Sequence, residues 1–417
     1  MSIPSNRTGC LVFTVIAVLC THMLNAADTR PDVNVSGVLA VDYVGYDRRN
    51  VRDSGFRYDR AVIRIEGQVG PLLRWRIAPD LLGIDTRYGL EEAWVSFERD
   101  TRLRATLGLI KIPMGVETTL PLEELPFVGY AFPAFLDGRT DIALELDGEF
   151  REGFLSYDLA ATLGEGFDPN GQARNEPQFS AKLVAYPWRG SEYTISVLGF
   201  ELPVLSGFFA GVGYSYTPTY DGELDVANSL RNKLFDTPDM EAGSSHYLHF
   251  SWGLDAGPVR LLHEFFRNGS ILDLELEDGT ETDLEDQIGG WAASASWMLT
   301  GETYDSRPFR QRNGKSGPFP AKPMYQHGDR SKGLGALELA FRYANADIDR
   351  DFFLLGFTDF ETSSQEFRTA EGAVNWYLSE QLRLSFQVVR TIADQRPAVF
   401  DSHGRDTSYV VRAQFRF

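Results

Sequence analysis

Cysteine is almost absent from this 417-residue chain, which contains only Cys10 and Cys20. Both lie in a short apolar run, residues 10–20, that follows Arg7. The run is too short to cross a bilayer as a helix, which takes ~20 apolar residues, and it is typical of a secretory signal peptide. We therefore expect a leader at residues 1–26, cleaved near residues 25–27. The mature chain then has no disulfide, thiolate metal site or cysteine nucleophile.

Long apolar runs are missing from the rest of the chain, which excludes an α-helical membrane protein. Linkers, heptads and low-complexity tracts are missing as well, so we expect residues 27–417 to form one domain. The chain does contain 39 glycines and 13% aromatic residues, and its net charge is -19. The acidic balance disfavours a nucleic-acid partner. A transmembrane β-barrel fits this composition, because its strands are only half apolar.

The C-terminal segment has the clearest period-two pattern. One parity is apolar or small (Tyr409, Val411, Ala413, Phe415, Phe417) and the other is polar (Ser408, Arg412, Gln414, Arg416), with Val410 as the exception. Since side chains alternate between the faces of a strand, this segment offers one face to an apolar phase and the other to water. It is typical of a barrel's closing strand, which would pair with the first strand near residues 33–46 and turn Arg412 and Arg416 to the lumen. The alternative is a half-buried edge strand of a soluble protein.

The same alternation returns along the chain, for example in residues 291–299, 336–343 and 381–390. About seventeen candidate strands suggest a barrel of sixteen or eighteen, because bacterial barrels prefer even numbers. Short turns are expected at 69–71, 256–258 and 379–380, and longer connections at 111–139, 218–244, 268–287, 300–334, 345–365 and 392–405. Short turns at one end, long loops at the other and aromatic residues near strand ends predict an all-β, transmembrane antiparallel barrel of the outer membrane.

Six segments resemble the family of phosphate-selective porins O and P. They follow the family order over nearly the whole mature chain: FRYDRAVIRIEG at 56–67, LEEAWV at 90–95, GLIKIPMGVE at 108–117, WMLTGETY at 297–304, GALELAFRY at 335–343 and VNWYL at 374–378. The resemblance implies a sixteen-stranded homotrimeric porin whose third loop, here about residues 111–139, folds inward and narrows the lumen. It also implies that small anions such as phosphate pass along inward arginines to lysines at the constriction.

The candidates for that anion path are Lys111, Arg139 and the paired basic residues Arg60, Arg64, Arg74, Arg76, Arg102 and Arg104. Spacings of two or four place each pair on one face of its strand. A fixed cation in a narrow lumen lowers the entry barrier for an anion. The alternative is that these arginines solvate a polar lumen, balanced by Asp59, Glu66 and Glu92.

The constriction segment departs from the family in its charge. Where the family has a Glu-Arg pair after the loop's phenylalanine, this chain reads Phe127-Val128-Gly129-Tyr130, and Thr140 replaces a later basic residue. The acids Glu123, Glu124 and Asp137 lie close by in sequence. This change predicts weak anion selectivity. A second acidic run, residues 273–286, is either a solvated loop tip or a loop bridged by divalent cations to lipid or to a neighbouring subunit.

No catalytic signature is found. His246 and His249 would point to opposite faces of a strand, and the adjacent carboxylates Glu91-Glu92 and Glu123-Glu124 would diverge on one. We therefore expect no enzyme, metal or cofactor, and a porin for passive diffusion of small anions, with outer-membrane lipid and an anionic solute as partners. The alternatives are a general or weakly selective porin, and a surface-binding barrel with little conductance.

Overall fold

The computed structural model describes residues 32–47, 53–82, 89–132, 140–162, 177–197, 200–203, 205–218, 220–222, 225–237, 240–275, 281–304, 335–394 and 404–417. The expected leader, Asp137 and Arg139 lie outside these ranges. Within them, no helix is long and apolar enough to span a membrane.

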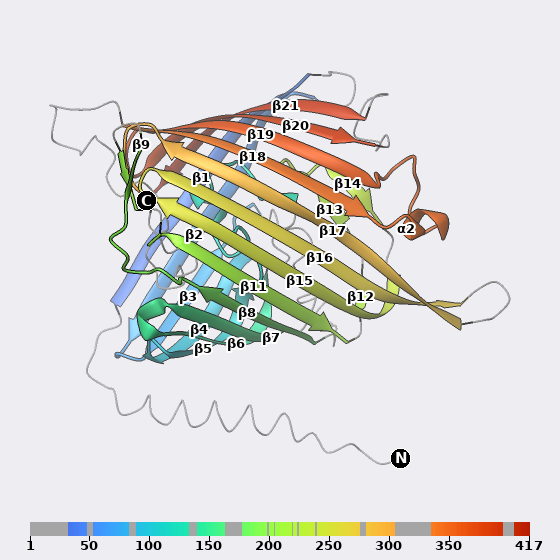
Figure 1. Cartoon of the computed structure of the whole chain (residues 1–417), viewed down its shortest axis with the longest axis horizontal. Coiled ribbons are helices and arrows are strands. Elements are labelled where there is room, and N and C mark those ends of the chain that lie inside the picture. Colours follow the sequence, from blue (N-terminus) through green and yellow to red (C-terminus); the bar gives the residue numbers. More distant parts are fainter. Residues whose placement is uncertain are drawn as a thin grey trace, which may run out of the picture.

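Sixteen long strands form the barrel wall, and each pairs antiparallel with its neighbours. They are β1 (Asp32–Tyr46), β2 (Gly55–Val69), β3 (Leu73–Pro79), β4 (Leu90–Asp100), β5 (Leu103–Lys111), β6 (Thr140–Phe150), β7 (Leu155–Thr162), β8 (Gln178–Ala185), β11 (Phe208–Thr217), β15 (Met240–Ala256), β16 (Val259–Glu275), β17 (Glu281–Met298), β18 (Ala336–Ile348), β19 (Glu366–Tyr377), β20 (Leu382–Ala393) and β21 (Arg405–Arg416). The short strand β12 (Tyr220–Gly222) extends the pairing of β15. Figure 1 shows the strands inclined side by side around the molecule.

The first and last strands close the ring, as predicted. They pair from Val38 opposite Arg416 to Tyr46 opposite Ser408. The count of sixteen is therefore confirmed, and every long strand has a partner on both sides, so the wall has no open edge for another chain to pair with.

The period-two pattern sets the faces of these strands. In β21, Tyr409, Val411 and Phe415 are exposed on the outer surface, whereas Arg412 and Gln414 are buried inside. Val410 breaks the pattern because it also points inward, where it packs with Val44, Val128, Leu230 and Val389. An apolar residue on the inward face indicates that something apolar lies within the lumen.

The connections differ from the simple asymmetry expected from the sequence. Short turns join β2 to β3, β15 to β16 and β19 to β20 at one end of the barrel, which we call the turn end. Two pairs of strands that end there are joined by longer connections: β8 and β11 through residues 186–207, which contain the hairpin β9 (Ile195–Val197) and β10 (Phe200–Leu202), and β17 and β18, whose connection is described only at its two ends. The loop expected at 268–287 is wrong in extent, because β16 and β17 continue as a paired hairpin to Glu275 and from Glu281. The side chains of the acidic run there lie outside the described part.

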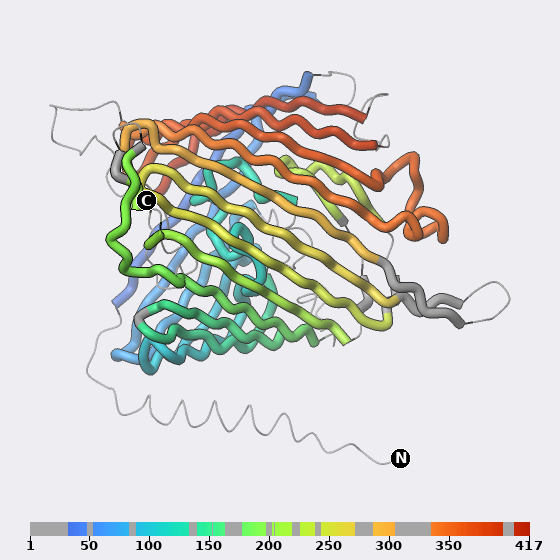
Figure 2. Tube along the Cα trace, in the orientation of Figure 1, coloured from blue at the N-terminus to red at the C-terminus, as the bar shows by residue number. Residues whose placement is uncertain are grey.

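Two segments fill the lumen from within. The inward loop, residues 112–132, contains the short helix η1 (Leu122–Glu124), and the inner hairpin, residues 225–237, contains β13 (Asp225–Ala227) and β14 (Lys233–Asp236). Figure 2 shows the inward loop in cyan, enclosed by the strands. An apolar cluster joins both segments to the wall and to α2 (Asp351–Leu354); it includes Met114, Phe132, Val226, Phe235, Phe266, Phe352 and Phe367.

Candidate pore constriction

Lys111 stands where β5 enters the inward loop. Its Nζ donates hydrogen bonds to the Leu120 carbonyl at 2.9 Å and to the Tyr130 hydroxyl at 3.3 Å, and it lies 4.0 Å from Glu91 Oε1. Lys111 is only 8% exposed. Because its donors face the loop's own oxygen atoms, Lys111 ties the two arms of the inward loop together.

The first arm of the loop is fastened to β8, β15 and β16. The Val116 N–H donates to Glu264 Oε1 at 2.6 Å, and the same oxygen lies 3.1 Å from His249 Nε2. Lys182 Nζ donates to the Gly115 carbonyl at 2.8 Å. As predicted, His246 points the other way, and its Nδ1 lies 2.6 Å from the Tyr214 hydroxyl on the outer face. No group of three potential metal ligands is found among the described residues.

Arg342 of β18 anchors the centre of the loop. Its guanidinium donates to Glu117 at 3.0 Å, to Glu371 at 2.9 Å and to the Gly129 carbonyl at 2.9 Å. Its carbon Cζ also lies 4.2 Å from the ring centre of Phe127, in a cation–π contact. Arg342 is fully buried. The sequence reasoning missed this residue, although it lies in the family-like segment 335–343.

The far side of the loop is held by polar side chains of β19 and β20. Asn375 and Arg383 donate to the carbonyls of Pro126 and Leu125, each at 2.8 Å. Gln387 Oε1 accepts the Val128 N–H at 2.8 Å. The inward loop, in which only the three residues of η1 are helical, is thus positioned by side chains from seven of the sixteen wall strands: β5, β8, β15, β16, β18, β19 and β20.

Arg60 and Arg64 meet two carboxylates instead of facing open water. Arg60 lies 2.6 Å from Glu91 and 3.4 Å from Glu123; Arg64 lies 2.8 Å and 2.6 Å from the same residues. Burial raises the pKa of Glu123, but the charges of Arg64 and Arg60 lower it more, from an ordinary 4.5 to about 2. Glu123 is therefore an anion at neutral pH, and the four charges neutralise one another in pairs.

The expectation that Glu91 and Glu92 diverge is wrong. Both reach inward arginines, since Arg76 Nη1 donates to Glu92 at 2.9 Å while Glu91 binds Arg60. The register between β3 and β4 shifts at Ala78 and Pro79, and an extra residue at such an irregularity changes which side chains face inward. The neighbouring Glu123 and Glu124 lie on η1, where Glu124 is 3.7 Å from Arg416.

The other candidate arginines of the strands are also paired. Arg74 lies 3.4 Å from Glu98, Arg76 lies 2.7 Å from Glu66, and Arg104 binds Asp147 through two hydrogen bonds of 2.9 and 2.7 Å. The expected partnership of Arg102 with Arg104 on one face is wrong, because Arg102 lies in the exposed turn between β4 and β5.

The closing strand behaves as predicted at its end. Arg412 is fully buried and donates to Asp42 at 2.7 Å and to Asp59, whereas Arg416 is partly exposed in the lumen. Phe417 is 56% exposed on the outer surface, with its ring 6.3 Å from that of Phe415.

The inner hairpin adds a second layer that sequence reasoning did not foresee. Ser229 Oγ donates to Glu371 at 3.0 Å and Asn228 to Thr391 at 3.1 Å. A Cβ atom at Gly129 would lie 1.9 Å from the Ser229 carbonyl oxygen, so only glycine lets the two inward segments meet there. The family departure at Val128-Gly129 therefore has a structural reason, since Val128 packs on Leu230 of the hairpin. The sequence signal was a connection containing apolar Val226, Leu230, Leu234 and Phe235.

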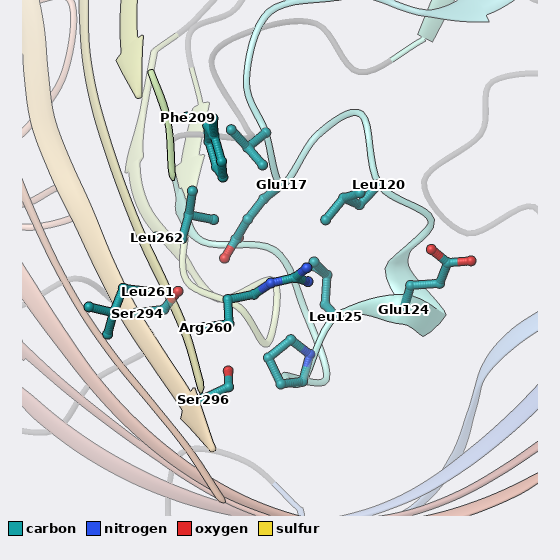
Figure 3. A pocket seen from close by; sticks show the side chains of 12 residues that line it. Glu117, Leu120, Glu124, Leu125, Phe209, Arg260, Leu261, Leu262, Ser294 and Ser296 are labelled. Carbon is teal, nitrogen blue, oxygen red and sulfur yellow. The ribbon is translucent and has the colours of Figure 1, made fainter. Parts of the chain in front are cut away.

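A small cavity of about 20 Å³, enough for a water-sized molecule, remains between the inward loop and β11, β16 and β17. Figure 3 shows Glu117 on the loop side and Arg260 on the wall side, with Leu120, Leu125, Phe209 and Leu262 around them. Arg260 is held by Asp255 through hydrogen bonds of 2.6 and 2.7 Å. Its lining combines apolar side chains with charges of both signs.

Comparison with known proteins agrees with this architecture. The chain resembles the outer membrane channel DcaP of Acinetobacter baumannii (TM-score 0.55, 10% identity, covering 94% of this chain and 99% of that one). It also resembles OprB of Pseudomonas putida (TM-score 0.53, 12% identity, covering 95% of this chain and 96% of that one). A third similar structure is the trimer form of OmpT, an outer membrane protein of Vibrio cholerae (TM-score 0.53, 9% identity, covering 93% of this chain and 100% of that one). No curated protein matches the chain.

These similarities define a class: the chain has the fold of an outer-membrane porin, which is a channel fold. Within that class, residues 273–417 match the family of phosphate-selective porins O and P. The resemblance stated from the sequence is confirmed over this part of the chain.

Proposed function

We propose that this protein is a porin for passive diffusion of small hydrophilic solutes across the bacterial outer membrane, with weak charge selectivity. The observation that carries the proposal is the pairing of charges inside the closed barrel. Each candidate cation on the described strands has a carboxylate within 4.0 Å, from Arg60 with Glu91 to Arg104 with Asp147. A paired arginine presents little net charge to a passing ion, so its attraction for anions is small.

A selective anion channel, with phosphate as solute, is the second candidate. The family match at residues 273–417 favours it. In that case Lys111, Arg60 and Arg64 would have to exchange carboxylate partners for the anion, and Arg139, which lies outside the described residues, would join them. A barrel that binds partners at its surface and conducts little is the third possibility.

Two further properties belong to the proposal. One is export, with residues 1–26 as a cleaved leader and residues 27–417 as the barrel domain. The other is assembly into a homotrimer, supported by the trimer form of the similar OmpT.

Conductance measured in a planar lipid bilayer distinguishes the three proposed functions. In a KCl gradient we expect steady channels whose reversal potential lies near zero, and phosphate that leaves the chloride current largely unblocked. A strong chloride preference that Lys111→Glu abolishes would favour the anion channel instead. The absence of any conductance from correctly folded protein would overturn the porin proposal.

A further inference from the structure

Glu338 of β18 is a buried carboxylate on the inward face of the wall. It is 2% exposed and lies opposite Asn375 of β19. Its two oxygens accept hydrogen bonds from three neutral groups: the Tyr304 hydroxyl, the Tyr377 hydroxyl at 2.7 Å and the Asn375 side-chain amide at 2.9 Å. A buried charge is costly unless such donors surround it. The four side chains therefore form one fixed unit, which we call the turn-end clamp.

The members of the clamp come from three distant segments, residues 297–304, 335–343 and 374–378. All three resemble the porin family in sequence, and all lie within the range that matches the family, residues 273–417. The first segment ends in the connection that follows β17, and the other two cover parts of β18 and β19. The clamp therefore joins the start of that connection to the barrel wall.

The clamp also fixes which way the side-chain amide of Asn375 faces. A carboxylate only accepts hydrogen bonds, so the amide nitrogen must face Glu338. The amide oxygen, on the other side, accepts the Ser385 hydroxyl at 2.6 Å. The second hydrogen of the nitrogen donates to the Pro126 carbonyl of the inward loop at 2.8 Å. A reversed amide would place its oxygen against both the carboxylate and the Pro126 carbonyl, which are acceptors like itself.

We propose that Glu338 is a positioning residue of the pore constriction, because it holds the Asn375 amide in the one orientation that binds the inward loop at Pro126. The inference rests on the proposed porin function, since it concerns a loop that narrows a conducting path. Glu338 is buried and acts through Asn375, not on the solute. Without Glu338 the amide is free to turn over, the Pro126 carbonyl loses its donor, and the loop leaves the wall more often.

Single-channel recording in a planar bilayer measures this motion as transitions between conductance levels. The net strength of one hydrogen bond corresponds to about a two- to tenfold change in an equilibrium constant. We therefore expect Glu338→Ala to spend about two- to tenfold more time in altered conductance levels than the parent. Glu338→Met removes the acceptor while keeping most of the volume, so it should behave in the same way and carries the test if the alanine variant does not fold.

Two variants should keep the behaviour of the parent. In Glu338→Gln, the new amide oxygen is able to accept from Asn375 and Tyr377, and the nitrogen to donate to the Tyr304 hydroxyl. Glu380→Ala is the matched control, because it removes an exposed carboxylate at the same end of the barrel, in the turn between β19 and β20. A glutamine variant as unsteady as Glu338→Ala, or an equal effect of Glu380→Ala, would overturn the inference.

A double-mutant cycle distinguishes positioning from a general loosening of the wall. Asn375→Ala removes the donor to Pro126 itself and should match Glu338→Ala in its effect. If Glu338 acts through Asn375, adding Glu338→Ala to Asn375→Ala should change nothing further, because the two side chains share one pathway. Additive effects of the two substitutions would contradict the proposed role.

Thiol labelling of the folded protein gives a readout that needs no conductance. Residues 27–417 contain no cysteine, and Leu125, next to Pro126, is 2% exposed, so Leu125→Cys introduces a single buried thiol. Labelling it requires local opening of the loop, and we expect Glu338→Ala and Asn375→Ala each to speed it by about two- to tenfold. Equal rates in the parent and in Glu338→Ala would overturn the inference even if every variant conducts. Faster labelling in a protein that conducts no current would instead overturn only the porin proposal.

Discussion

At the scale of single residues, the lumen is held together by buried ion pairs. Arg342 and Arg412 are fully buried, and each meets two carboxylates. Taking a charge out of water costs several kcal/mol unless partners surround it. Such pairs therefore fix the geometry of the inward loop more than they add stability, and they explain why inward arginines need not make an anion channel.

Replacing Arg342 by Gln should destabilise the protein by about 3–5 kcal/mol, because Glu117 and Glu371 would remain buried without their cation. The free energy of unfolding in urea measures the loss. Arg102→Gln is the matched control. Because Arg102 is exposed in a turn, this substitution should change the free energy of unfolding by no more than about 0.5 kcal/mol. Equal effects of the two variants would contradict the anchoring role of Arg342.

Glu123 gives a pH prediction. Its pKa in the folded protein, about 2, lies below the ordinary 4.5, so the ionised form stabilises the fold above pH 4.5, and this contribution is lost as pH falls toward 2. Glu123→Gln should therefore be less stable than the parent at pH 7, and the difference should shrink between pH 4.5 and 2. A constant difference across that range would show that Glu123 acts through shape and not through charge.

At the scale of elements, alternation sets the face of a residue until the register shifts. A shift between Ala40 and Val41 of β1, opposite Arg60 and Tyr58, lets the consecutive Asp59 and Arg60 both turn inward. A register shift between Ala78 and Pro79 of β3, opposite β4, likewise lets both Glu91 and Glu92 turn inward. Parity counting cannot locate such shifts, because the extra residue is unpaired and leaves no mark in the hydrophobic pattern.

The inner hairpin should limit conductance. Replacing residues 226–236 by a short Gly-Ser linker removes Leu230 and Phe235 from the lumen, so single-channel conductance should rise. Lys233→Ala is the control, because Lys233 forms a half-exposed pair with Asp236, worth about 0–1 kcal/mol. If the variant without the hairpin folds and its single-channel conductance does not exceed that of the parent, the conducting path does not pass the hairpin.

At the scale of the whole molecule, the wall separates two media. Its outer face is apolar, and its inner face carries the ionic network. Ala413→Arg places a charge near the middle of the apolar stretch of β21 and should cost about 2–4 kcal/mol, whereas Thr407→Arg, near its border, should cost about 0–1 kcal/mol. Urea unfolding from lipid vesicles measures both. Equal costs would mean that the apolar band lies elsewhere on the wall.

The sequence by itself determined the barrel, its closure and the inward face of Arg412, because alternation and the aromatic strand end depend only on local periodicity. It also indicated the inward loop through the resemblance around Lys111. Three points were decided only by the tertiary structure. Lys111 donates its hydrogen bonds to oxygen atoms of the inward loop, Arg342 binds the centre of that loop, and the inner hairpin packs at Ser229 against Gly129. The contacts of Arg342 with Glu117 and of Ser229 with Glu371 and Gly129 join residues 100 or more positions apart. The choice among many possible carboxylate partners depends on which strands the closed ring brings face to face.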